Sequence, residues 1–452
     1  MTRAPRMLSL GAFIYPTGHH IAAWRQRDAC AEAGVDFEHY VRLARAAERG
    51  LFDMMFLADS LAVLPRQGET MAAVSRIAHF GHFEPLTLLS ALAARTTHLG
   101  LVATVTTTYN EPYHVARKFA SLDQISGGRA GWNLVTSASP DEAFNFSRDV
   151  HPQHADRYRR ARAFAEVVQG LWDSWDDDAF VRDKAGGLFF VPDRMHVLDH
   201  HDPYFSVRGP LNVPRSPQGA PVLVQAGSSD DGKDLAAETA EVVFTAHQGV
   251  EPARAFYADV KARAARAGRD PDSIRIMPGV FPVIGRTEPE ARERYEELQA
   301  LIAPEVAVTL LSRMTGVDFS PYPIDGPVPA LPEVIGGKSR SAMLNALARE
   351  QDLTVRQLAL RIAGARGHWQ IVGTPSQIVD QLEHWFRAGA ADGFNVMPPV
   401  LPQGLDDFVD HVVPELQRRG LFRTAYAGRT LRAHLGLTPP ANGFTRRAPA
   451  QR

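Results

Sequence analysis

The sequence has one cysteine, Cys30, among 452 residues, so no disulfide can form within the chain. It also has no excess charge of one sign, since 49 Lys and Arg residues oppose 51 Asp and Glu residues. A near-neutral chain offers no field for holding polyphosphate, which argues against a nucleic-acid partner. The most apolar stretch, 51–64, is interrupted by Asp53 and Asp59 and is shorter than the roughly 20 residues of a membrane-spanning helix. With no secretion signal visible, we expect a cytoplasmic protein without a membrane partner.

Glycine-rich phosphate loops are lacking too. The segment GGKS at 336–339 has the end of a nucleotide-triphosphate loop, but Pro332 stands where the first glycine belongs. No G-x-G-x-x-G follows a strand-like segment. The chain therefore shows no fingerprint for a nucleoside triphosphate or a dinucleotide.

Strand-like and helix-like segments alternate along the chain, with a hydrophobic content of 45% that suits a large core. Eight apolar segments are predicted as strands, each followed by a helix, and they start at 7, 51, 98, 129, 221, 241, 274 and 392. Eight such units predict an α/β fold, a TIM (β/α)₈ barrel. We interpret 176–220 and 303–375, the latter with an extra helix at 341–365, as loop insertions of a single domain, 1–452.

Several polar residues follow predicted strands, where barrel enzymes carry their sites. Ser228 and Ser229 begin a helix, whose free amides either bind an anion or are simply capped by serine. His154 and Tyr158 lie one helical turn apart, so they either donate to one phosphate or edge the core. Asp59 ends an apolar strand, and a buried carboxylate there needs a partner.

The segment HVLDHHD at 196–202 gathers three histidines and two aspartates. These are metal-ligand types, but they lie in an irregular stretch without ordered spacing. We favour packing within the insertion, and no metal site is predicted.

Four long runs resemble one family: GLVATVTTTYNEPYHVARKFASLDQISGGRAGWNLVTS (100–137), HADRYRRARAFAEVV (154–168), PVLVQAGSSDDG (221–232) and GFNVMPPVLPQGLDDFVDHVVPELQRRG (393–420). They are similar to the bacterial-luciferase-like flavin monooxygenases of the nitrilotriacetate and dibenzothiophene-sulfone monooxygenase type. The resemblance covers almost the whole chain. It implies a TIM barrel with insertions, reduced FMN (FMNH₂) as a dissociable co-substrate, O₂, and a separate NAD(P)H:FMN reductase. We also expect a homodimer or homotetramer.

The resemblance assigns flavin contacts by position. Asp59 is expected against the flavin ring, and Thr104 and Thr106 along it, with Thr106 standing where serine is commoner. Asn133 and Thr136 are expected to flank the flavin. His154, Tyr158 and Ser229, beside Ser228, are expected to hold the ribityl phosphate, which favours the anion interpretation of this helix start.

For chemistry, the resemblance implies a flavin C4a-(hydro)peroxide, which lasts only if water is excluded and donors hold its distal oxygen. The candidate donors are His20, Ser137 and Ser139, each of which is otherwise a loop residue without a role. Phe13, Phe56 and Phe244 are candidates for the wall of an apolar substrate pocket, or are ordinary core residues.

The leading hypothesis is an FMNH₂-dependent monooxygenase of a two-component system, which transfers one oxygen atom to a small organic substrate. An F420-dependent oxidoreductase of the same fold is the alternative enzyme. A non-catalytic flavin-binding protein is the alternative outside enzymes. The sequence leaves the substrate open.

Overall fold

The computed structural model describes residues 6–447 except 64–70, 79, 316, 330–343, 345–346 and 366. The segment GGKS and Pro332 therefore lie outside the described residues.

Eight parallel strands close into a barrel, in the order β1, β2, β3, β4, β7, β8, β9, β11 and back to β1. They are β1 (Ser9–Ile14), β2 (Met54–Leu57), β3 (Gly100–Thr106), β4 (Ala130–Val135), β7 (Val222–Gln225), β8 (Val242–Thr245), β9 (Arg275–Ile284) and β11 (Gly393–Val396). All eight lie within the predicted strand segments, and the predicted TIM barrel is confirmed. Almost every strand residue is buried, as expected where helices cover a parallel sheet.

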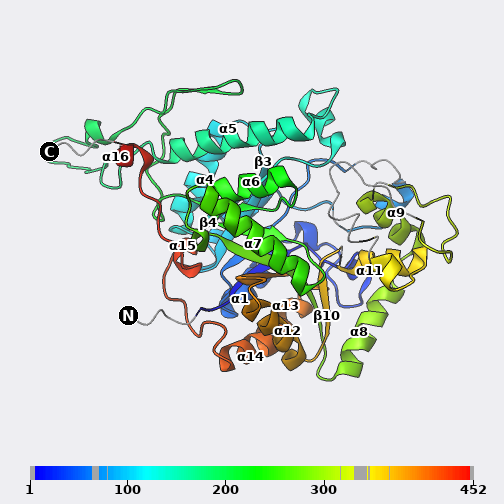
Figure 1. The fold of residues 1–452 in the computed structure, drawn as a ribbon. Helices are drawn as coiled ribbons and strands as arrows, with labels where there is room; N and C mark the ends of the chain where they lie inside the picture. The colour runs from blue at the N-terminus through cyan, green and yellow to red at the C-terminus, as the bar shows by residue number, and fades with distance from the viewer. Residues whose placement is uncertain are drawn as a thin grey trace.

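Helices surround the barrel and return the chain from one strand to the next (Figure 1). They are α1 (Phe37–Arg49), α3 (Pro85–Ala93), α4 (Pro112–Ser126), α5 (His154–Trp172), α6 (Asp230–Thr239), α7 (Val250–Arg266), α8 (Glu288–Ala300), α12 (Pro375–Arg387), α13 (Gln403–Asp407) and α14 (Val413–Arg418). Local signals set their ends: Asp36 caps α1 by accepting from the amide of His39, and α4 ends at Gly127 with φ 69°.

The interval 303–375 holds more structure than predicted. It contains α9 (Pro304–Thr315), α11 (Val355–Ala365) and the strand β10 (Trp369–Gly373), which pairs with the second half of β9. The single helix predicted over 341–365 is wrong in its described part, because 351–354 separate helical residues 347–350 from α11. Thr354 and Gln357 exchange side-chain and backbone hydrogen bonds at the start of α11, and this capping box fixes a new helix start.

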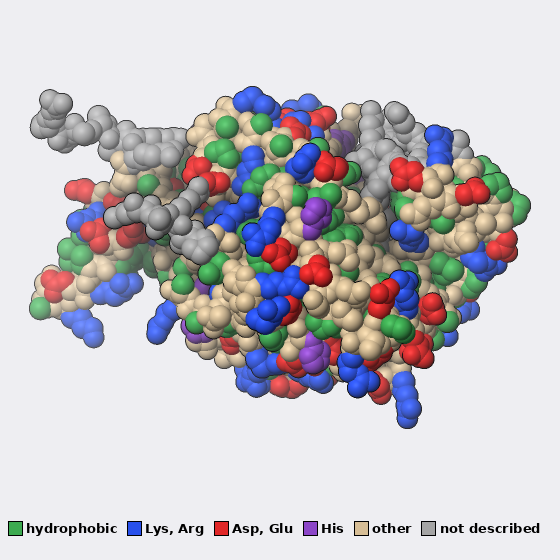
Figure 2. Space-filling model, turned by 60° about the horizontal axis from the view of Figure 1, so that its bottom comes forward, with side chains coloured by type: hydrophobic (Ala, Val, Ile, Leu, Met, Phe, Trp, Pro, Cys, Tyr) green, Lys and Arg blue, Asp and Glu red, His purple; other side chains and the backbone are tan. Residues whose placement is uncertain are grey.

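The remaining short elements lie outside the barrel wall. They are α2 (Met71–Val74), the two-stranded β5 (His200–His201) and β6 (Ser206–Val207), α15 (Leu431–His434) and α16 (Gly443–Arg447). Acidic and basic side chains are interspersed over the face in Figure 2, in line with the formal net charge of −2. Among the described residues, no helix has the length and apolarity to cross a membrane.

The amino ends of the strands are closed by the C-terminal part of the chain. Leu431 of α15 and Leu435, which follows this helix, join the apolar cluster inside the barrel. A Cβ on Gly100 or Gly131, near the starts of β3 and β4, would meet the side chain of Leu431. The barrel is therefore sealed at this end, which leaves the carboxyl ends of the strands for a ligand.

Candidate active site

The carboxyl ends of β2, β3, β4 and β7 border a cavity of about 680 Å³. TIM-barrel enzymes carry their active sites at this end of the barrel. Its wall includes six residues singled out from the sequence: Asp59, Thr104, Thr106, Thr136, Ser137 and Tyr158. The fold thus gathers residues from three strand–helix units into one place.

Next to the cavity, behind the lining residue Thr104, the barrel carries an amide with spare hydrogen-bonding capacity. Thr104 on β3 and Asn133 on β4 are neighbours in register, and Nδ2 of Asn133 donates to Oγ1 of Thr104 at 2.8 Å. Oδ1 of Asn133 is buried and has no donor within the described part of the chain. A buried acceptor left unpaired is costly, so this wall suits a ligand that offers an N–H group.

A hydrogen-bonded chain runs along the rim after β4. Oγ of Ser137 lies 2.8 Å from Oγ1 of Thr106 and 2.5 Å from a carboxylate oxygen of Glu142. The hydroxyl of Ser137 is thus within hydrogen-bond distance of both Thr106 and Glu142, and it can donate to either of them. Ser137 has φ 52°, the left-handed region that a non-glycine residue seldom adopts. Such strain gathers at functional sites, which draws attention to this residue.

Asp59 follows β2 and faces the same cavity. Burial raises the pKa of Asp59 above its ordinary value. The neighbouring carboxylates of Glu84 and Glu142 act in the same direction, whereas the amide of Ser60, which donates to Oδ1 at 2.9 Å, lowers it. A carboxylate in this position interacts strongly with any donor that a ligand brings.

The turn from β7 into α6 forms the other end of the cavity, where Gly227 and Tyr158 line it. Oγ of Ser229 accepts from the amide of Gly232 at 3.2 Å, so the predicted serine cap is confirmed. The hydroxyl of Tyr158 lies over this turn, since a Cβ on Gly227 or Gly232 would be 3.0 or 3.1 Å from it. The first amides of α6 have no intrahelical partner, and the helix dipole adds positive potential there. Capping and anion binding are compatible at this turn.

The two acidic residues in the first turn of α6 have different partners. Asp230 pairs with Lys233 at 3.0 Å and with Arg263 at 2.8 Å. Oδ2 of Asp231 lies 3.2 Å from Nδ1 of His154, and the ring of His154 packs against Tyr158 with centroids 4.7 Å apart. Half-buried Ser228 precedes the cap. The structure therefore brings His154, Tyr158 and Ser229 together as the sequence predicts.

Two of the candidate donors lie away from the cavity wall. Nε2 of His20 is 3.0 Å from Oε1 of Gln299 on α8, and burial lowers the pKa of His20 to about 4. Ser139 is buried, and its hydroxyl donates to a carboxylate oxygen of Asp141 at 3.2 Å. Of the three candidates, only Ser137 reaches the cavity.

The three phenylalanines form one aromatic cluster inside the barrel. The ring centroid of Phe13 lies 4.7 Å from that of Phe56 and 5.3 Å from that of Phe244. All three are buried, and none borders the 680 Å³ cavity. Their packing is that of a core, and a role against substrate stays a prediction.

Among the cavity residues that the sequence analysis did not single out, two shape the site through hydrogen bonds. Gln225 ends β7, and its Oε1 accepts from the amide of Gly227 at 2.8 Å, which shapes the turn. A polar residue at the end of the apolar run VLVQ was a readable signal, as Asp59 was for β2. Glu142 comes from a 3₁₀ segment, Pro140–Phe146, and nothing in the sequence pointed to it.

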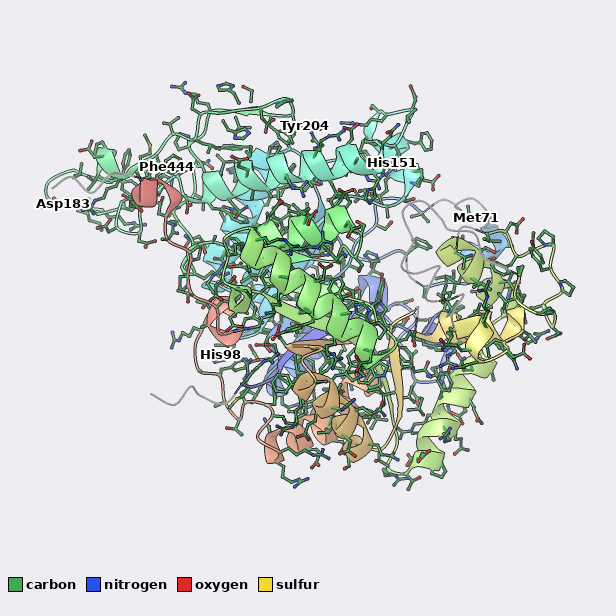
Figure 3. All side chains as sticks on the ribbon, in the orientation of Figure 1. Met71, His98, His151, Asp183, Tyr204 and Phe444 are labelled. Carbon is green, nitrogen blue, oxygen red and sulfur yellow. The ribbon has the colours of Figure 1, made fainter. Side chains whose placement is uncertain are left out.

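The histidine-rich segment of the insertion is far from this cavity. His196 pairs with Asp176 at 2.9 Å, and His200 pairs with Asp202 at 2.6 Å. The ring of His196 stacks on Phe444, which Figure 3 shows at the opposite end of α5 from His151. Among the described residues, no group of three or more His, Cys, Asp or Glu side chains is arranged to hold a metal.

Several known proteins are similar to this chain in sequence or in fold. A family profile described as "Luciferase-like monooxygenase" matches residues 17–392. The chain is 50% identical to the N-acetyl-S-(2-succino)cysteine monooxygenase of Bacillus subtilis (strain 168), over 99% of this chain and 100% of that one. It is 49% identical to nitrilotriacetate monooxygenase component A of Aminobacter aminovorans, over 98% of this chain and 99% of that one.

Among solved structures, a riboflavin lyase crystallised with modified FMN and riboflavin superimposes with a TM-score of 0.86. It is 33% identical, and the alignment covers 96% of this chain and 97% of that one.

Proposed function

Since the chain belongs to the luciferase-like monooxygenase family, we propose that it uses FMNH₂ and O₂ to transfer one oxygen atom to a small organic substrate. The resemblance deduced from the sequence is thereby confirmed at the level of the family. The proposal extends to a two-component system, because one relative is named as a component A. A separate NAD(P)H:FMN reductase would then supply the reduced flavin.

One observation carries the flavin assignment: a single cavity joins a wall of polar strand ends to a helix start suited to an anion. Behind Thr104 of this wall, Oδ1 of Asn133 lacks a donor among the described residues, and a flat ring bearing N–H groups would supply one. Gly227 itself has no Cβ in this turn, so its backbone is open to close approach by a phosphate, with the Tyr158 hydroxyl and the Gln225 amide nearby. The residues present thus fit FMN.

In this arrangement we assign the ring to Asp59, Thr104, Thr106, Asn133 and Thr136, and the phosphate to His154, Tyr158, Ser228 and Ser229. Reduced FMN, when bound, supplies the electrons that activate O₂. The chain contributes binding, orientation and shielding from water. Ser137, ordered by Glu142, is the best-placed of the candidate donors, because it alone faces the cavity.

Flavin-binding measurements test this assignment and separate it from the F420 alternative. Titrations followed by flavin fluorescence should give one site per chain, with FMN bound much more tightly than riboflavin. Tyr158→Phe should weaken FMN binding about tenfold and leave riboflavin binding unchanged, because only the phosphate loses a donor. Equal affinity for FMN and riboflavin, or a preference for F420, would reject the assignment.

The relatives define a first substrate panel. N-acetyl-S-(2-succino)cysteine and nitrilotriacetate, from their names, should be tried first. Oxygen uptake that depends on one of them distinguishes an oxygenase from a non-catalytic flavin-binding protein. Uptake without any dependence on the panel means that the substrate belongs to another class.

A further inference from the structure

The phosphate end of the cavity contains an acidic residue whose presence needs an explanation. Asp231 is the second residue of α6, within the turn proposed to bind the flavin phosphate. A carboxylate there repels a phosphate and competes with it for the same amides. Simple electrostatics therefore predicts that this acid weakens FMN binding.

The neighbouring acid, Asp230, shows that a negative charge at this helix start can be compensated by nearby cations. The carboxylate of Asp230 is compensated by Lys233 and Arg263, at 3.0 and 2.8 Å. No cation of this kind is found beside Asp231 within the described part of the chain. Its recorded partner is Nδ1 of His154, 3.2 Å away.

We propose that Asp231 is a positioning residue for the flavin phosphate: it accepts the Nδ1–H of His154 and so turns Nε2 toward the phosphate. This inference rests on the proposed function, in which His154 is a phosphate ligand. It adds a residue that acts through the histidine and does not touch the phosphate itself.

The surroundings of the ring support this role. His154 is the first residue of α5 and is about one-third exposed, so without Asp231 its ring would have several rotamers open to it. Nδ1 lies 3.2 Å from Oδ2 of Asp231, and the ring packs tilted against Tyr158, so Nε2 is the ring nitrogen left for a ligand. A histidine that donates from both nitrogens is a cation, and its bond to a phosphate is charge-assisted.

The proposal and simple electrostatics predict opposite signs for one substitution. Asp231→Ala removes a negative charge near the phosphate, which by itself tightens FMN binding. If the carboxylate orients His154, the same change weakens FMN binding about tenfold. Asp230→Ala is the matched control, since it removes an equal charge from the same turn without touching His154.

The experiment is a set of fluorescence titrations of the full chain and its variants with FMN and with riboflavin. We expect Asp231→Ala to raise the Kd for FMN about tenfold and to leave the Kd for riboflavin unchanged. Asp230→Ala should leave FMN binding equal or slightly tighter. In a His154→Gln background, Asp231→Ala should no longer weaken FMN binding, because the residue through which Asp231 acts is gone.

Three results would overturn the proposal. The first is that Asp231→Ala binds FMN as tightly as the parent or more tightly. The second is that Asp231→Ala loses affinity for FMN and for riboflavin equally. The third is that Asp231→Ala weakens FMN binding just as much in the His154→Gln background. The second result would mark a structural role for Asp231, with riboflavin reporting on the intact fold. A parent protein that binds FMN and riboflavin equally would instead reject the phosphate site itself, so the two failures are distinguishable.

Discussion

Buried carboxylates lie at the amino ends of the barrel strands, which form the closed end, whereas the polar residues of the candidate site lie at the carboxyl ends. Asp53 accepts from the amide of Leu10 at 2.6 Å and pairs with Arg423. Asp392 accepts from the amide of Ile276 at 2.9 Å. Each carboxylate satisfies the second amide of a strand, while the first amide bonds to a backbone carbonyl. These acids serve the fold, and Asp59 at the other end serves the cavity.

Asp123 gives a pH-dependent test of such a structural acid. Burial raises the pKa of Asp123 to about 6 from an ordinary value of 3.8, although hydrogen bonds from Ser216, Ala130 and Gln218 act against this shift. A raised pKa means that the protonated form stabilises the fold, fully at low pH and no longer once the pH rises through about 6. Asp123→Asn should therefore gain stability relative to the parent, on the order of 2 kcal/mol, between pH 4 and pH 7.

Urea unfolding of both proteins across this pH range measures that difference. Asn at 123 keeps an acceptor for the amide of Ala130, so the comparison isolates the charge. A difference that stays constant with pH would show that Asp123 does not titrate in this range.

Asp59 should behave in the opposite way from these structural acids. Asp59→Ala should lower flavin affinity at least tenfold while leaving the melting temperature within a few degrees, because the side chain faces the cavity. Flavin titration and thermal melting of the same preparation check both parts. Parent-like flavin affinity together with a large drop in melting temperature would show that Asp59 serves the fold and does not contact the flavin.

At the scale of elements, the turn between β7 and α6 depends on two glycines packed against each other. A Cβ on Gly232 would lie 2.9 Å from the backbone of Gly227 and 3.1 Å from the hydroxyl of Tyr158. Alanine normally stabilises a helix by up to about 1 kcal/mol over glycine. We expect Gly232→Ala to do the reverse here, lowering both stability and FMN affinity, as denaturation and titration will measure. A stabilised variant with parent-like FMN affinity would show that the turn accommodates the added Cβ without strain.

The helices and strands differ in how well they could be predicted from the sequence. All eight barrel strands were predictable because strands buried on both faces have continuous apolar runs, such as GLVATVT of β3. The short strand β10 was missed, because it pairs only with the part of β9 that extends beyond its neighbours. The break before α11 was predictable in principle from Thr354 and Gln357, a capping pair that the apolar periodicity concealed.

The site was predictable where a residue ends a strand or starts a helix, as with Asp59 and Ser229. It was not predictable where loops decide which side chains meet. Glu142 reaches Ser137 because of the path of a 3₁₀ segment, and the loop after β1 places His20 against Gln299 of α8. Neither path leaves a periodic signal in the sequence.

At the scale of the whole molecule, the closed and open ends of the barrel should respond independently to substitution. Arg432 is 2% exposed, and its guanidinium donates hydrogen bonds to both carboxylate oxygens of Glu241 at the closed end of the barrel. Arg432→Met should lower the free energy of unfolding by about 3–5 kcal/mol, because Glu241 is left without its cation. Adding Glu241→Gln should restore part of this loss. Folded samples of either variant should bind FMN as the parent does, and a weakened FMN Kd would show that the two ends are coupled.

The central claim is that this barrel transfers oxygen with reduced flavin that another protein supplies. The most direct measurement is a set of turnovers under ¹⁸O₂ with FMN, NADH and the substrate panel, with and without an unrelated NADH:FMN reductase. With the reductase, the product should carry one ¹⁸O atom; without it, NADH oxidation and product should both stay near background. Robust NADH-dependent product formation by the chain alone, or product without ¹⁸O in the presence of the reductase, would contradict the account.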